Sequence, residues 1–70
     1  MIKLYSAVWC GYCQKAKHHL QTLNKEFEVV DIDEVEDLPE EFNRTGTIPQ
    51  IFEDGRFIGG YTELVKEYPL

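Results

Sequence analysis

The two cysteines of the chain, Cys10 and Cys13, are the residues best suited to chemistry, because they lie three positions apart in the run Trp-Cys-Gly-Tyr-Cys. In the first turn of a helix, this spacing brings two side chains close enough to form a disulfide. The unpaired N–H groups and the dipole at a helix N-terminus favour the thiolate form of the first cysteine. Because a thiolate is the species that attacks a disulfide, the pair predicts thiol–disulfide exchange. Cys10 is expected to be the attacking thiol and Cys13 the resolving thiol.

Two other interpretations of these cysteines have to be weighed. They could be small buried residues without chemistry, but a pair that follows a strand and opens a helix favours a redox role. They could also bind zinc together with His18 and His19. Adjacent histidines on a helix point about 100° apart, however, and zinc fingers separate their ligand pairs by about a dozen residues. We therefore expect no metal site and two solvated histidines.

The elements around the cysteines form a βαβ unit. Ile2–Ser6 alternates apolar and polar residues, which predicts a strand that leads to Cys10. From Cys13 onward, apolar residues at helical spacing predict a helix; they are Ala16, Leu20 and Leu23. Phe27–Ile32 is rich in β-branched residues and apolar on both faces, which predicts a strand covered on both sides and parallel to the first.

A short helix and a hairpin are predicted next. The spacing of Val35, Leu38 and Phe42 allows a second helix, with Asp37 and Pro39 near its start. Asp54-Gly55 is a strong hairpin signal, and it is flanked by two candidate strands, Gln50–Phe52 and Phe57–Ile58.

The last element is a helix. Its apolar positions follow a 0, 3, 4, 7 spacing, with Thr62 as a candidate N-cap after Gly59-Gly60; they are Tyr61, Leu64, Val65 and Tyr68. The order is therefore βαβαββα, an α/β fold in which three helices flank both faces of a four-stranded mixed sheet. Residues 1–70 are expected to form a single domain.

The composition excludes several classes of function. Thirteen acidic residues against seven Lys and Arg give a net charge of −6, which would repel nucleic acid. No apolar run approaches the roughly 20 residues of a membrane span, so no membrane partner is expected. We find no secretory signal pattern at the N-terminus, and we therefore expect a cytoplasmic location.

Three motifs, in this order along the chain, resemble those of the glutaredoxins. Cys10-Gly11-Tyr12-Cys13 resembles their Cys-Pro-Tyr-Cys site, residues 47–52 (Thr-Ile-Pro-Gln-Ile-Phe) their Thr-Val-Pro segment, and residues 59–63 (Gly-Gly-Tyr-Thr-Glu) their Gly-Gly-Tyr-Thr-Asp segment. Small phage-type and bacterial glutaredoxins are the closest in size. The resemblance implies a thioredoxin-like fold.

The resemblance also implies a binding site for glutathione. It predicts a cis peptide between Ile48 and Pro49 that faces the cysteines, and an anion at the start of the last helix, where backbone N–H groups are natural donors. The residues expected to bind glutathione are Tyr12, Thr47, Ile48, Pro49, Gly60, Tyr61, Thr62 and Glu63. Glutathione would be the reductant, and no bound cofactor is expected.

The sequence departs from the family pattern at three positions. Ala7 stands where the family commonly has Lys or Arg, and Gly11 replaces a proline that would preorganise the helix start. The missing cation weakens glutathione binding or is replaced by one of three others, Lys15, Lys17 and Arg44. Trp9 is similar to the residue that thioredoxins have at this position, and their substrates are protein disulfides.

The leading hypothesis is therefore a monomeric, glutathione-dependent thiol–disulfide oxidoreductase that reduces protein disulfides or glutathione mixed disulfides. Its protein substrates could include a ribonucleotide reductase. One alternative is a thioredoxin-like reductant served by thioredoxin reductase. Another is a protein that holds a [2Fe–2S] cluster between two subunits with glutathione, which the small residue Gly11 would permit. An intact Cys13 argues against a non-catalytic interaction module.

Overall fold

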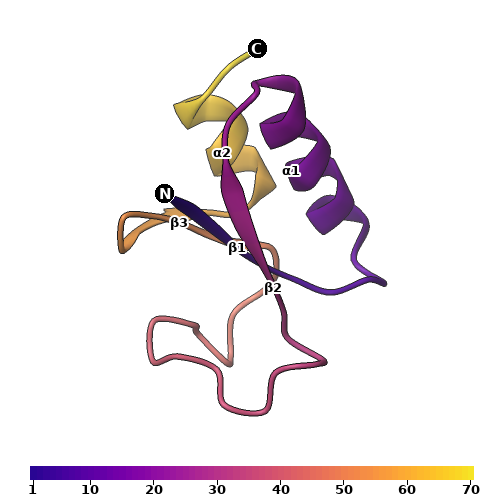
Figure 1. Ribbon diagram of the computed structural model, residues 1–70, viewed down its shortest axis with the longest axis vertical. Coiled ribbons are helices and arrows are strands. Elements are labelled where there is room, and N and C mark those ends of the chain that lie inside the picture. The colour runs from indigo at the N-terminus through magenta and orange to yellow at the C-terminus, as the bar shows by residue number, and fades with distance from the viewer.

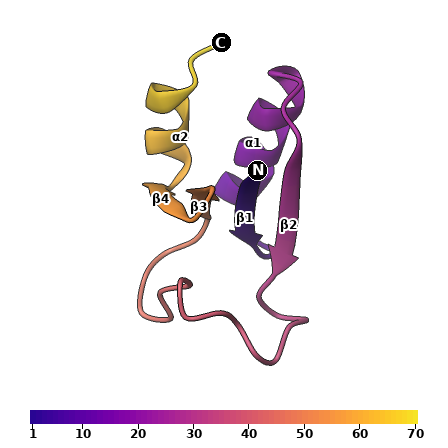
Figure 2. The same cartoon turned by 60° about the vertical axis from the view of Figure 1, so that its left-hand side comes forward.

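The computed structural model describes all residues, 1–70. The chain forms four strands and two helices: β1 (Ile2–Ser6), α1 (Gly11–Thr22), β2 (Phe27–Asp31), β3 (Gln50–Glu53), β4 (Arg56–Gly59) and α2 (Tyr61–Glu67). Figure 1 shows their arrangement, and β4 is labelled in Figure 2. All four strands and the first and last helices lie where the sequence predicts them, so the local patterns were sufficient to find them.

The strands form one mixed sheet in the order β2-β1-β3-β4. β1 and β2 are parallel, which confirms the βαβ unit, whereas β3 is antiparallel to both β1 and β4. The predicted hairpin turn joins β3 to β4, with φ of 50° at Asp54 and 85° at Gly55. Two consecutive positive φ values match the right-handed twist of the paired strands, which explains why the turn selects Asp-Gly.

Both helices cover the same face of the sheet (Figure 2). The main core forms where the two helices meet β1 and β3, and its six buried residues are Ile2, Leu4, Ala16, Leu20, Ile51 and Leu64. Alternation along β1 sends Ile2 and Leu4 to this face and Tyr5 to the other. The prediction of helices on both faces was therefore wrong.

The opposite face is covered by the long connection between β2 and β3. Tyr5, Phe42 and Phe52 form a small core there, and Leu38 packs against it. The predicted second helix is absent: residues 33–49 form turns and bends. Pro39 disfavours helical geometry at Leu38, and the many acidic side chains between residues 33 and 41 would repel one another along a helix too short to form alone.

Two further expectations need correction. β2 lies at the edge of the sheet and is not covered on both sides, since Val29 is 43% exposed. The N-cap of α2 is Gly60 rather than Thr62. Neither helix has the length and apolar character that a membrane crossing requires.

Candidate active site

The turn between β1 and α1 places Cys10 as the N-cap residue of α1. Cys10 has extended backbone angles, φ −92° and ψ 112°, and the helix begins at Gly11. The Cys10 N–H donates to the Ala7 carbonyl at 3.1 Å, which closes the turn that leads out of the sheet. An N-cap side chain accepts from the first-turn N–H groups of its helix, so this position gives a thiolate at Cys10 its donors.

The Cys10 sulfur already accepts such a bond. The Cys13 backbone N–H donates to Cys10 Sγ at 3.1 Å, and the Cys10 thiol lies 3.8 Å from the Ile48 carbonyl, to which it donates. Both cysteines are free thiols. The N–H contact is of the kind that would stabilise a negative charge on Cys10 Sγ.

The two thiols differ in accessibility. Cys10 is 8% exposed and lines a groove, whereas Cys13 has no exposed surface. Burial, followed by the hydrogen bond with Cys10, raises the pKa of Cys13 to about 11. Cys13 is therefore a protonated thiol at neutral pH, which suits the predicted order of attack, with Cys10 first and Cys13 second.

All eight residues expected to bind glutathione line one groove. This groove, here called the Tyr12 groove, has a volume of about 190 Å³ and is lined by Tyr12, Thr47, Ile48, Pro49, Gly60, Tyr61, Thr62 and Glu63. The Ile48-Pro49 peptide is cis, as the family resemblance implies. The rings of Tyr12 and Tyr61 lie 6.1 Å apart. Segments distant in sequence therefore meet here, as predicted.

The N-terminus of α2 is partly capped by Glu63, a side chain of the same helix. The Gly60 N–H donates to Glu63 Oε1 at 2.7 Å, so this donor is already used. The N–H groups of Tyr61 and Thr62 have no acceptor within the helix. Gly59 is required for the close approach of Glu63: its φ is 131°, and a Cβ there would lie 2.6 Å from Glu63 Cγ.

A second groove opens on the other side of Ile48. It has a volume of about 410 Å³, is here called the Trp9 groove, and is lined by Trp9, Cys10, Ile32, Phe42, Arg44, Gly46, Thr47 and Ile48. Trp9 Nε1 donates to Asp33 Oδ2 at 2.7 Å, which orients the exposed ring. Because Cys10 forms part of its wall, a bound chain could reach the sulfur from this side.

The three candidate replacement cations lie in different places. Arg44 lines the Trp9 groove. Lys15 Nζ lies 5.2 Å from the centre of the Tyr12 ring, beside the Tyr12 groove. Lys17 lines neither groove. Arg44 and Lys15 are thus the two positioned to attract an anion near Cys10.

Sequence reasoning missed the role of Gln50. Its buried side chain accepts from the Asn43 N–H at 2.9 Å and donates to the Asn43 carbonyl at 2.8 Å, which closes the loop that carries Thr47 and Ile48. The available signal was a polar residue next to buried strand positions, where a hydrogen-bonding role is the usual explanation.

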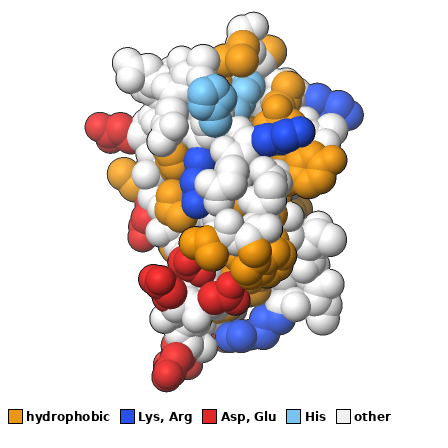
Figure 3. Space-filling view, turned by 90° about the vertical axis from the view of Figure 1, so that its right-hand side faces the viewer, with side chains coloured by type: hydrophobic (Ala, Val, Ile, Leu, Met, Phe, Trp, Pro, Cys, Tyr) orange, Lys and Arg blue, Asp and Glu red, His pale blue; other side chains and the backbone are white.

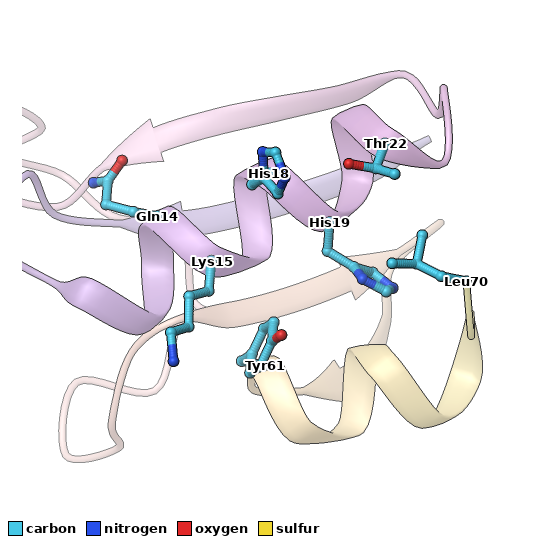
Figure 4. A pocket seen from close by; sticks show the side chains of 7 residues that line it. All are labelled: Gln14, Lys15, His18, His19, Thr22, Tyr61 and Leu70. Atoms are coloured by element: carbon cyan, nitrogen blue, oxygen red, sulfur yellow. The ribbon is translucent and has the colours of Figure 1, made fainter.

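The largest groove lies elsewhere, between α1 and α2. Figure 4 shows its seven lining residues, which include His18, His19 and Tyr61 but neither cysteine. His18 is exposed as expected. The prediction was wrong for His19, which is 5% exposed with Nε2 2.6 Å from the Tyr68 carbonyl. This contact joins the two helices.

No three His, Cys, Asp or Glu side chains lie together in a group that could hold a metal ion. A [2Fe–2S] cluster takes four thiolate ligands, and in the predicted alternative two subunits and two glutathiones would supply them together, one chain contributing only Cys10 because Cys13 is fully buried. The chain therefore does not fit such a cluster by itself.

The charge around the site is uneven. Figure 3 shows the side of the molecule where the turn before α1 lies: hydrophobic side chains gather near its middle, acidic ones to the lower left, and histidines with several cations above. Nine of the thirteen acidic residues lie between Glu26 and Glu41, so the Trp9 groove borders an acidic segment. The surface around the turn before α1 is therefore acidic on one side and more basic on the other.

A dithiol at the N-terminus of the first helix, beside a cis-proline loop and on this sheet, defines a protein of thioredoxin-like α/β fold. The glutaredoxin family model matches residues 2–58. Glutaredoxin-C1 of Arabidopsis thaliana is 35% identical over 71 residues, which cover 93% of this chain and 57% of that protein. The chain therefore belongs to the glutaredoxin family.

Solved structures agree on the fold. Holo glutaredoxin C1 from Populus tremula x tremuloides superposes with a TM-score of 0.81 at 29% identity, covering 96% of this chain and 66% of that one. A buckwheat glutaredoxin in complex with glutathione superposes with a TM-score of 0.82 at 22% identity, with the same two coverages. The chain thus spans about three fifths of these relatives, and the small phage or bacterial subtype stays a prediction.

Proposed function

We propose that the protein is a glutathione-dependent thiol–disulfide oxidoreductase that reduces glutathione mixed disulfides and protein disulfides. The observation that supports this most directly is the position of Cys10 Sγ, which caps α1 and accepts from the Cys13 N–H at 3.1 Å. A sulfur held this way has an N–H donor at hand and forms part of a groove wall, where a substrate can reach it.

With a glutathione mixed disulfide, one thiol suffices. The Cys10 thiolate attacks the glutathionyl sulfur, forms a disulfide with it, and releases the substrate thiolate, which takes up a proton. A second glutathione thiolate then attacks the sulfur of the bound glutathione. Oxidised glutathione leaves, and Cys10 is again a thiolate.

With a protein disulfide, Cys13 completes the reaction. Cys10 first forms a mixed disulfide with one substrate sulfur and releases the other as a thiol. Cys13 then loses its proton and attacks Cys10 Sγ, which releases the second substrate thiol and leaves a Cys10–Cys13 disulfide. Two electrons and two protons have passed to the substrate, and two glutathione molecules restore the dithiol.

The Tyr12 groove is the proposed binding site for glutathione. Its eight residues are the ones that the family resemblance singled out, and a buckwheat glutaredoxin of the same fold was solved with glutathione. Lys15, beside this groove, would attract a glutathione carboxylate.

We also propose that residues 1–70 act as one domain and as a monomer in the cytoplasm, with no nucleic-acid or membrane partner. The chain has no disulfide framework beyond this one redox pair, which suits a reducing compartment, and the net charge is −6. A ribonucleotide reductase disulfide is included among the protein substrates to be assayed.

The test is a steady-state assay with NADPH, glutathione reductase, glutathione, and a peptide that carries a glutathione mixed disulfide. The parent protein should turn over. Cys10→Ser should reduce turnover to background, because it removes the attacking sulfur. Cys13→Ser should keep this activity but lose the reduction of an intramolecular protein disulfide.

A parallel assay replaces glutathione and its reductase with thioredoxin reductase. Turnover only in that assay would contradict the proposal and make the protein a thioredoxin-like reductant. Visible absorption after anaerobic purification addresses the cluster alternative: a coloured dimer would contradict the proposal, whereas a colourless monomer agrees with it.

A further inference from the structure

Ser6, the last residue of β1, carries a buried hydroxyl without a hydrogen-bond partner. The residue is 1% exposed, and its Oγ is the one buried side-chain N or O atom in the protein that has none. An unpartnered buried hydroxyl costs stability, and it therefore needs an explanation. The glutathione site described above makes no use of Ser6.

The direction of β1 places this hydroxyl beside the resolving thiol. Alternation puts Ser6 on the same face as Ile2 and Leu4, the face that packs against α1. β1 ends shortly before α1 begins, which brings its last residue toward the first buried residue of the helix, Cys13. Cys13 itself has no exposed surface.

The surroundings of the Cys13 sulfur contain few groups that could stabilise a thiolate. The apolar residues Ala7, Ile32 and Ile48 pack around the two thiols. Against the larger effect of burial, two polar groups near Cys13 lower its pKa, the Ala7 backbone and the Ser6 side chain. Cys10 is the one titratable group that acts on Cys13.

We propose that the Ser6 hydroxyl donates a hydrogen bond to the Cys13 thiolate as it forms, and so promotes the resolving step without contributing to the attack by Cys10. This inference rests on the proposed dithiol reaction. The Ser6 hydroxyl has no acceptor while Cys13 holds its proton. It gains one when the proton leaves.

The hydrogen bond from Ser6 acts in the resolving step, in which Cys13 attacks the mixed disulfide. Cys13 gives up its proton, attacks Cys10 Sγ in the mixed disulfide, and forms the Cys10–Cys13 bond while the substrate sulfur leaves and is protonated. A donor that stabilises the ionised Cys13 increases the fraction of protein able to react at neutral pH. The mixed-disulfide reaction of Cys10 with glutathione does not pass through this species.

The two steps can be separated with 5,5′-dithiobis(2-nitrobenzoate) in stopped flow under single-turnover conditions. Attack by Cys10 releases a first equivalent of coloured thiolate, and resolution by Cys13 releases a second. A matched pair of variants, Ser6→Thr and Ser6→Val, has nearly the same shape and differs in the hydroxyl. Ser6→Ala is a smaller variant that creates no crowding.

We expect Ser6→Val and Ser6→Ala to slow the second phase by about tenfold at pH 7, the effect of losing one hydrogen bond to a charged group. The first phase should stay at the parent rate. Ser6→Thr should restore the second phase, and the pH profile of that phase should move to higher pH in the variants without a hydroxyl.

Three results would overturn the inference: a second phase at the parent rate in Ser6→Ala, an unchanged pH profile, or equal slowing by Thr and Val. If Ser6→Val does not fold, Ser6→Ala decides. Failure of the proposed function is distinguishable, because the parent would then lack the first phase or turnover with glutathione.

Discussion

Replacing Gln50 by alanine should destabilise the protein and loosen the loop that carries Thr47 and Ile48. The Gln50 side chain is 3% exposed and makes two hydrogen bonds to the backbone of Asn43, at 2.9 and 2.8 Å. At about 1 kcal/mol for each bond, the free energy of unfolding should fall by about 2 kcal/mol. For a domain of this size, that corresponds to a decrease in Tm of roughly 8–16 °C.

Urea unfolding followed by circular dichroism measures the stability, and the glutathione mixed-disulfide assay measures the site. We expect KM for the mixed disulfide to rise several-fold, because Thr47 and Ile48 line both grooves. Gln21→Ala is the matched control, since Gln21 is exposed on α1; it should leave both quantities close to those of the parent. The reasoning is refuted if Gln50→Ala unfolds at the parent's urea midpoint or behaves like the control.

Three further substitutions and one change of pH test other parts of the structure. Gly59 has φ 131°, and Glu63 lies in the way of a Cβ there, so Gly59→Ala should lower the free energy of unfolding by about 1–3 kcal/mol in urea titrations. Gly11→Ala is the contrasting substitution, because a Cβ at Gly11 meets no atom within 4 Å. It should be neutral or stabilise the protein by up to about 1 kcal/mol. Glu63→Gln keeps an acceptor for the Gly60 N–H but removes a carboxylate of the Tyr12 groove that can pair with the glutathione ammonium group, so KM for the glutathione mixed disulfide should rise about two- to threefold in the steady-state assay; an unchanged KM would argue against glutathione in this groove. The reduced protein should lose stability as pH rises from about 9 to 11, because the native state still holds the Cys13 proton that the unfolded chain has lost. At about 1.4 kcal/mol per pH unit, the loss attributable to Cys13 is about 2–3 kcal/mol, measured as the difference from Cys13→Ser, and below pH 9 the two proteins should show the same pH dependence.

The part of the fold that could be predicted from the sequence is the part governed by local patterns. The alternation in Ile2–Ser6, the helical spacing after Cys13 and the Asp54-Gly55 turn each identify an element through its own residues. The residues of the Tyr12 groove were found differently. They come from three separate segments, and the resemblance to the glutaredoxins singled them out together.

What the sequence could not supply depends on contacts between distant residues. Leu38 and Phe42 have helical spacing, but their apolar side chains pack against the sheet from an irregular segment. His19 lies on a helix rich in polar residues, so the sequence gives no sign that it is buried. Its Nε2 is satisfied by one backbone carbonyl at the end of α2, that of Tyr68. Ser6 and Gln50 are polar residues in strands, where the pattern gives no indication of which partner they meet.

The irregular connection between β2 and β3 provides six of the eight residues that line the Trp9 groove, all except Trp9 and Cys10. The reactive sulfur and the surface beside it therefore reside in separate stretches of the chain: the sulfur depends on a regular strand and helix, and most of the Trp9 groove depends on a loop. Loops accept insertions and substitutions more readily than packed elements. Evolution or engineering could therefore reshape the Trp9 groove by exchanging residues between Ile32 and Gly46, while the dithiol, its helix and the Tyr12 groove stay unaltered.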